Sequence, residues 1–201
     1  MFKLDMIRDI KLGQQASRLG GGKSTSENDE IRILWPGFIH VGYFDEHLIT
    51  VDHVKNHDDL EQIYRLRKIA EDGDIIMKLS SPYEACLINR PEEDYVIPSY
   101  CCIIRNFFSN KAPAIPNEYI CAILNSDFAK KEISKRMKSS INNPMLKIAD
   151  LKNLPIPDVS SIEMNRIGEL FIHSTENRMN MAKLLHSEEM ILNNLIYSRI
   201  I

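Results

Sequence analysis

Leu146-Lys147-Ile148-Ala149-Asp150-Leu151-Lys152-Asn153-Leu154-Pro155-Ile156-Pro157 is the stretch that decides the fold, because a short apolar run ends in Pro-x-Pro just before a long helical pattern. Proline fixes its own backbone and disfavours a helical conformation in the preceding residue. A helix is therefore expected to start only after this stretch. The sequence predicts one globular domain over residues 1–158 and a long helix over 159–201.

The predicted C-terminal helix has signals at its start and along its length. Ser160 or Ser161 can cap it, Glu163 lies in its first turn, and no proline interrupts it through Ile201. About 40 residues of helix extend roughly 60 Å, which is too long for one small domain to cover. A heptad-like apolar stripe runs along it, made of Ile167, Leu170, Met181, Leu184, Ile191 and Leu195. This stripe predicts a coiled-coil interface with a second copy or a partner chain.

The region before the junction predicts an α/β (α+β) domain with a β-rich core and short helices. Apolar, β-branched runs of strand length occur at 75–79, 85–88 and 96–105. At 31–41 such residues flank a Pro-Gly turn, which predicts either two short strands or a strand and a bend. Helical patterns follow at 117–124, with Asn117 as its N-cap, and at 127–137, and a shorter one ends near 71. At 201 residues the chain is long enough for one good core with an appendage.

Composition places the chain among folded proteins, with 44% hydrophobic and 26% charged residues. No signal-peptide-like or membrane-spanning run is present, so a cytoplasmic location is expected. The cysteines, Cys86, Cys101, Cys102 and Cys121, form no CxxC pair and are expected to be buried free thiols.

Charge is divided unevenly along the chain, although the net charge is only −3. Residues 45–74 contain nine acidic and four basic residues, a net charge of −5, whereas residues 127–152 contain seven basic and three acidic residues, a net charge of +4. The basic segment is compatible with a surface that faces phosphates, and equally with a solvated helix face.

Motifs for catalysis and cofactors are incomplete. Gly22-Lys23-Ser24 lacks the earlier glycine of a phosphate loop, because Ser17 occupies that position. His53 and His57 are four residues apart but lack the third ligand of a zinc site. Asn143-Pro144 lacks the second proline and the aromatic residue of a base-flipping methyltransferase motif. We therefore expect no metal, no cofactor and no active site of its own.

The order of short motifs along nearly the whole chain resembles the specificity (S) subunit of type I restriction-modification systems. The motifs are Lys11-Leu12-Gly13, Ile33-Leu34-Trp35-Pro36-Gly37-Phe38-Ile39, Gly73-Asp74-Ile75-Ile76, Val96-Ile97-Pro98-Ser99, Ile103-Ile104-Arg105, Tyr119-Ile120, Leu124-Asn125-Ser126 and the 151–157 part of the junction. The resemblance implies a target recognition domain followed by a spacer helix. In a full-length subunit two such units occur in tandem with antiparallel helices, whereas this chain contains one.

Recognition of duplex DNA requires donors and acceptors at base edges, together with cationic or hydroxyl groups on phosphates. Loops and strand ends supply such groups here. The candidate DNA-contact residues are Lys23, Lys78, Ser80, Tyr83, Arg105, Lys138, Asn142, Asn143 and Lys147. The competing interpretation for each of them is that it is an ordinary polar loop residue with no contact to DNA.

The resemblance implies a non-catalytic subunit that directs methyltransferase (M) and restriction (R) subunits to double-stranded DNA. A half-length chain could form a homodimer through its helix and read a symmetric split target, or it could be a truncated or phase-variable fragment. The alternative function is a helix-mediated regulator that retains the fold and competes with a functional specificity subunit. A nuclease is the third possibility.

Overall fold

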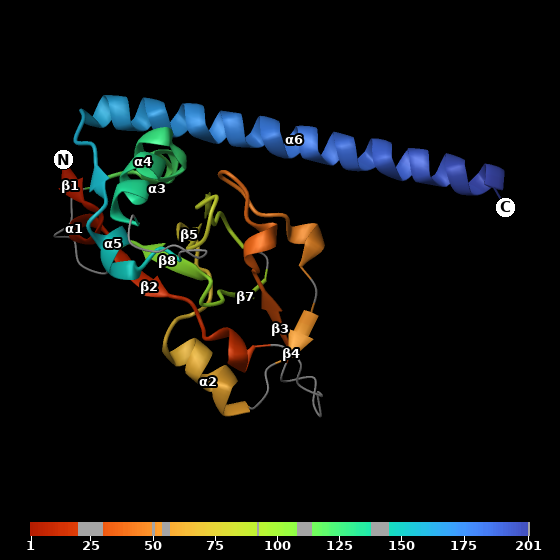
Figure 1. Cartoon of the computed structure of the whole chain (residues 1–201), viewed down its shortest axis with the longest axis horizontal. Helices are drawn as coiled ribbons and strands as arrows, with labels where there is room; N and C mark the ends of the chain where they lie inside the picture. The colour runs from red at the N-terminus through yellow and green to blue at the C-terminus, as the bar shows by residue number, and fades with distance from the viewer. Residues whose placement is uncertain are drawn as a thin grey trace.

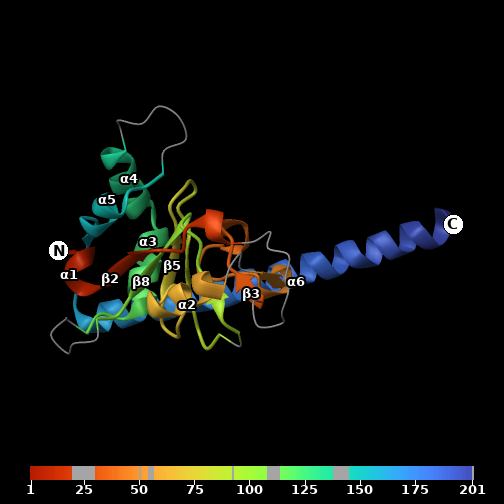
Figure 2. The same ribbon diagram turned by 90° about the horizontal axis from the view of Figure 1, so that it is seen from below.

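A computed structural model of the chain describes residues 1–19, 30–49, 51–53, 57–91, 93–107, 114–137 and 145–200. A mixed domain of small sheets and short helices is followed by one long helix, which lies along the domain and then projects beyond it (Figures 1 and 2). The predicted fold class, an α/β domain followed by a long C-terminal helix, is confirmed. None of the helices in the described ranges is long and apolar enough to cross a membrane.

The main sheet is antiparallel, with the strand order β2-β8-β5-β6. Its strands are β2 (Asp9–Leu12), β5 (Ile75–Lys78), β6 (Ala85–Leu87) and β8 (Cys101–Arg105). Every residue of the two central strands is buried, because packed clusters cover both faces of the sheet. The strands predicted at 75–79 and 85–88 are confirmed.

Alternation along β8 places neighbouring cysteines on opposite faces of the sheet. Cys102 packs in one hydrophobic cluster and Cys101 in the other. Burial raises the pKa of the Cys101 thiol to about 12, and it also raises the pKa values of Cys86, Cys102 and Cys121. All four are free and buried, so they act as small core residues rather than as nucleophiles.

Short helices cover one face of the main sheet. They are α1 (Leu4–Ile7), α3 (Asn117–Asn125), α4 (Asp127–Arg136) and α5 (Ile148–Lys152). Tyr119 and Ile133 from these helices pack in the same cluster as Ile75 and Ile104 of the sheet. The strand β1 (Phe2–Lys3) pairs with β9 (Pro155–Ile156), so the junction stretch closes the domain beside its first residues.

A smaller sheet, β4-β3-β7, lies beyond the other face. It contains β3 (Glu30–Ile33), β4 (Val51–His53) and β7 (Tyr95–Val96), with β3 and β7 parallel. The helix α2 (His57–Arg65) packs Ile63 against Ile33 and Val96 of this sheet. Because β4 ends before α2 begins, His53 and His57 do not share a helix, and the described residues contain no group of metal-ligating side chains.

Two local predictions were wrong, and one that left two alternatives is now decided. The single strand expected at 96–105 is divided between two sheets, because Pro98 lacks the N–H that a continuous ladder needs. Of the two alternatives for residues 31–41, the structure has the strand and bend: β3 is followed by a 3₁₀ turn at Pro36–Phe38. Asn117 is not the cap of α3: its Oδ1 accepts from Arg8 Nη2 at 2.8 Å and its Nδ2 donates to the Gly73 carbonyl at 2.8 Å.

The long helix α6 (Ser161–Ile200) begins where the sequence predicted. The Ser160 hydroxyl accepts the Glu163 N–H at 3.3 Å, and the Ser160 carbonyl accepts the Met164 N–H at 2.9 Å. The first part of α6 packs on the domain, with Met164 buried in the main core cluster. At Gly168, an added β-carbon would lie 3.0 Å from the Cβ of Glu118, so α6 and α3 approach closely at this point.

About two turns further along, α6 contacts the other half of the domain. Thr175 is 5% exposed and faces Gly42, whose φ of +90° places it in the left-handed region. A β-carbon at Gly42 would lie 2.2 Å from Thr175 Oγ1, so only glycine fits here. The domain therefore fixes the direction of α6 at two separate points.

Candidate nucleic-acid interface

One end of the main sheet gathers segments that are far apart in the sequence. Here β2 and β5 end and β8 begins. The Leu79 N–H donates to the Tyr100 carbonyl at 2.9 Å, and the Leu146 N–H donates to the Leu79 carbonyl at 2.6 Å. We call this surface the loop end, and it comprises residues 13–15, 78–84, 98–100 and 145–147.

Four of the predicted DNA-contact residues lie at the loop end. They are Lys78, Ser80, Tyr83 and Lys147. Lys147 is exposed, whereas Ser80 and Tyr83 are half-buried. The Tyr83 N–H donates to the Ser80 carbonyl at 2.9 Å, which fixes the turn between β5 and β6. Burial raises the pKa of the Tyr83 phenol, so this group stays neutral at physiological pH.

Lys78 has an internal partner. Its ammonium lies 2.6 Å from the Glu84 carboxylate, and its side chain is only 11% exposed. Its backbone N–H also donates to the Glu84 carbonyl at 2.9 Å, so the two residues close the base of the turn. The charge of Lys78 is thus already compensated within the domain. We assign it the role of holding the turn that presents Ser80 and Tyr83.

Tyr100 at the loop end and the adjoining Trp35 were not among the predicted contacts. The rings of Trp35 and Tyr100 have centroids 6.5 Å apart and are tilted by 39°. Tyr100 is 45% exposed, and Trp35 packs partly against the cluster of the smaller sheet. Neither was recognisable as a surface residue, because each adjoins an apolar run that is typical of a buried strand.

Arg105 lies at the opposite end of β8 and is buried. Its Nε and Nη2 donate to the two carboxylate oxygens of Asp74 at 2.7 and 2.6 Å, and Nη2 also donates to the Ile69 carbonyl at 2.8 Å. Burial alone would lower the pKa of Arg105, but the bonds to Asp74 and the charges of Asp74 and Glu71 raise it overall. The guanidinium group of Arg105 thus donates its hydrogen bonds to groups within the protein. We therefore assign Arg105 a structural role rather than a DNA contact.

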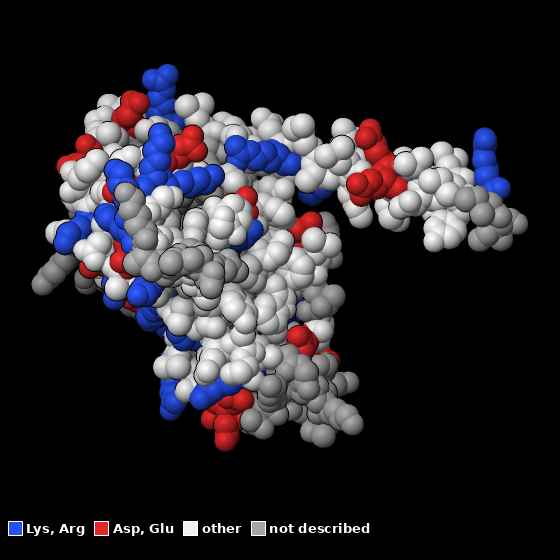
Figure 3. Space-filling model, in the orientation of Figure 1, with Lys and Arg blue, Asp and Glu red and all other residues white. Residues whose placement is uncertain are grey.

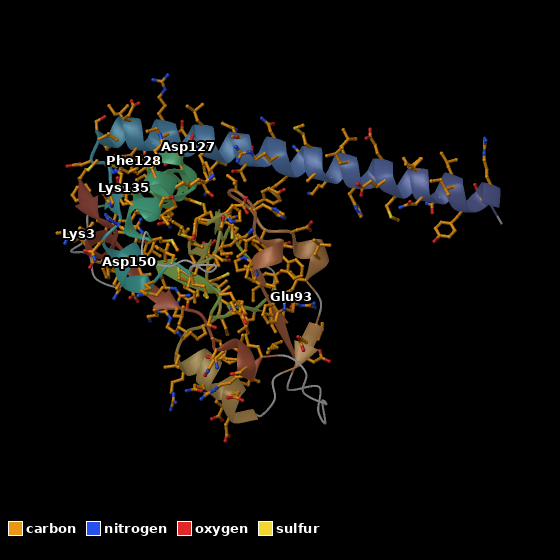
Figure 4. The ribbon with its side chains drawn as sticks, viewed as in Figure 1. Lys3, Glu93, Asp127, Phe128, Lys135 and Asp150 are labelled. Carbon is orange, nitrogen blue, oxygen red and sulfur yellow. The ribbon has the colours of Figure 1, made fainter. Side chains whose placement is uncertain are left out.

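A basic surface lies over α4 and α5, where Lys and Arg side chains gather in Figure 3. Figure 4 places the labelled Lys135 and Asp150 on this side of the domain. The exposed lysines of this surface are Lys131, Lys135, Lys147 and Lys152. Glu132 is paired with Lys135 and Arg136, and hydrogen bonding to Lys135 lowers the pKa of Glu132. The other three lysines have no ion pair with any described residue.

The remaining predicted DNA contacts, Lys23, Lys138, Asn142 and Asn143, lie outside the described residues.

The distal half of α6 forms a second candidate surface. Every residue from Asn180 to Arg199 is exposed. Five of the six predicted interface residues are between 55% and 64% exposed, namely Leu170, Met181, Leu184, Ile191 and Leu195. The sixth, Ile167, is half-buried against the core of its own domain. A neighbouring stripe, Leu185, Leu192 and Ile196, is also exposed.

Comparison with solved structures finds the same fold. No family model matches the chain, and no curated protein matches its sequence. A chain from a structure that describes complex assembly and conformational transition of the type I restriction-modification system matches 96% of this chain, with a TM-score of 0.54 and 14% identity. The HsdS subunit from Thermoanaerobacter tengcongensis matches 90%, with a TM-score of 0.55 and 14% identity. The chain has the fold of one half of a type I specificity subunit.

The specificity-subunit fold also matches part of a larger enzyme. The type IIG restriction endonuclease BpuSI matches 85% of this chain, with a TM-score of 0.57 and 12% identity. These matches span 42%, 38% and 26% of the three solved chains, respectively, so this chain corresponds to less than half of each. The resemblance found in the sequence motifs is thus confirmed at the level of the fold.

Proposed function

We propose that this chain is a DNA sequence-recognition subunit of a type I restriction-modification system and has no active site of its own. The observation that carries the proposal is the fold match to a type I system chain over 96% of the chain, which includes most of the long helix. The loop end supplies polar and aromatic groups suited to base edges, and the basic surface on α4 and α5 supplies lysines suited to phosphates. The methyltransferase and restriction subunits would supply the chemistry.

In this proposal the chain divides into a recognition domain (residues 1–158) and a helix (159–201) that pairs with a second copy and docks the methyltransferase. The exposed apolar residues beyond Asn180 support the pairing, because an isolated helix with apolar side chains on two faces gains stability by burying them. The first turns of α6 belong to the domain's core, so the part available for pairing starts near Asn180.

The first test measures retention of duplex DNA by the chain in the presence of its cognate methyltransferase. Replacing Lys131 and Lys147 by alanine should weaken retention for all sequences and reduce the slope of log K against log salt by about two, since each phosphate contact contributes about 0.9. The matched control replaces Arg65 and Arg90 by alanine, because both are exposed but lie away from this surface. This control should leave the slope unchanged. Equal slopes for both double variants would place the phosphate contacts elsewhere.

Retention also separates the two functions considered from the sequence. A wild-type complex that retains no DNA at low salt, while this chain still binds the methyltransferase, would favour the competing regulator.

The second test addresses pairing of α6. Replacing Leu184 and Ile191 by glutamate should raise the dissociation constant of a homodimer at least tenfold, because burying each side chain contributes roughly 1.5–3 kcal/mol. The control variant changes His186 and Asn193 to glutamate, which adds the same charge on another side of the helix. Sedimentation equilibrium gives the masses. If only the control variant dissociates, or if neither does, this stripe is not the homodimer contact.

A further inference from the structure

At the loop end, the ring of Tyr100 lies against the ring of Trp35, which borders this surface. Tyr100 is 45% exposed, and its ring contacts Trp35, which is itself anchored on Ile33 and Val96 in the cluster of the smaller sheet. Its carbonyl accepts the Leu79 N–H, so its backbone is tied to the turn that carries Ser80. An exposed tyrosine is thus held in a defined position by a partly buried tryptophan.

The groups around Tyr100 are mostly polar and uncharged. Ser81 and Gln15 are exposed, Ser80 and Ser99 are half-buried, and the charge of Lys78 is compensated by Glu84. Phosphates attract cations, whereas base edges are read by hydrogen-bonding and apolar groups. A neutral patch with one hydroxyl-bearing ring is therefore better suited to base edges than to the DNA backbone.

Charged residues on either side indicate where the phosphates would run. Lys147 borders the patch through the Leu146–Leu79 hydrogen bond, and the basic surface of α4 and α5 continues from it. On the other side, α2 packs Leu60 on the same cluster as Trp35. Its acidic residues Asp58, Asp59 and Glu61 outnumber Arg65 and the nearby Arg18, which pairs with Asp59. Carboxylates repel phosphates, so the duplex backbone would follow the lysine side and the groove would face Tyr100.

We propose that Tyr100 is a specificity-determining residue that contacts base edges in a groove of duplex DNA, with Trp35 positioning its ring. This inference rests on the proposed DNA-recognition function and names the residue that reads the sequence. Tyrosine suits this role because its ring provides rigid apolar contact area and its hydroxyl can both donate and accept a hydrogen bond.

The test uses the complex with the cognate methyltransferase and a duplex library with randomised positions. Retained DNA is sequenced for the wild type, Tyr100→Ala, Tyr100→Phe and the control Tyr64→Ala, an exposed tyrosine on α2. We expect Tyr100→Ala to relax the preference at one or two base pairs by about tenfold to a hundredfold, and Tyr100→Phe to relax it less. The control should select the same sequence as the wild type.

A second measurement reports on location without any substitution. Trp35 is the only tryptophan of the chain, so 5-fluorotryptophan incorporated into this chain alone gives one fluorine resonance in the complex. We expect the selected duplex to shift it and a non-selected duplex to shift it less. The wild type could retain a selected sequence while that duplex leaves the fluorine resonance unchanged and Tyr100→Ala keeps the wild-type base preference. This result would overturn the inference about Tyr100 and leave the proposed function standing. Absence of any selected sequence from the wild type would overturn both.

Discussion

Replacing Arg105 by methionine is expected to lower the free energy of unfolding by about 3–5 kcal/mol, because it removes one partner of a buried ion pair. The Asp74 side chain is 1% exposed and would keep only the Glu71 N–H, at 2.8 Å, as a described hydrogen-bond donor. Burial already raises the pKa of Asp74 even though Arg105 opposes that shift. Urea unfolding at neutral pH measures the loss.

Two comparisons show whether the orphaned charge causes this loss. Adding Asp74→Asn to Arg105→Met should recover part of the stability, because the amide oxygen can still accept the Glu71 N–H without a buried charge. In Arg105→Met alone, the folded state should bind a proton on Asp74 more readily than the unfolded state does. The loss is therefore fully present at neutral pH and shrinks as the pH falls through the raised pKa of Asp74. A loss below about 1 kcal/mol, independent of pH, would contradict the structural role of this pair.

The fold was largely predictable because its strongest determinants are local. The prolines at 155 and 157 separate the domain from α6, and Ser160 caps the helix. The apolar run at 75–79 forms a strand that is buried on both of its faces. Pairing between strands was not predictable, because β3 lies parallel to β7 and β2 pairs with β8 across long stretches of sequence. Periodicity indicates that a segment is a strand and contains no information about its neighbours.

The candidate site was predictable only as a collection of residue types. The sequence indicated Ser80, Tyr83 and Lys147, and tertiary hydrogen bonds at Leu79 bring their segments together. It could not distinguish these from Arg105, since a basic residue at a strand end is equally compatible with a surface contact and a buried partner. Asp74, the ion-pair partner of Arg105, was recognisable in the sequence only as part of a Gly-Asp turn.

Replacing Gly13 by alanine is expected to lower the free energy of unfolding by about 3 kcal/mol, near the upper range for overpacking a rigid site. An added β-carbon would lie 2.2 Å from the Pro98 carbonyl oxygen and 2.4 Å from the Ile97 carbonyl oxygen. Both are backbone atoms, so a change of side-chain rotamer cannot relieve the contact. The two segments are also held together here by the Gln14 N–H to Ile97 carbonyl bond and the Ser99 N–H to Gln14 carbonyl bond, both at 2.6 Å.

Gly37→Ala is the matched control, because nothing lies within 4 Å of a β-carbon at that position. It should change stability by at most about 1 kcal/mol, and it can be stabilising by restricting the unfolded chain. Urea unfolding of both variants tests the difference, and equal losses would mean that the 97–100 segment yields easily. If the segment is rigid, Gly13→Ala displaces Tyr100 together with Pro98. Under the proposed function, it should then alter sequence selection at temperatures where the variant remains folded, whereas Gly37→Ala should not.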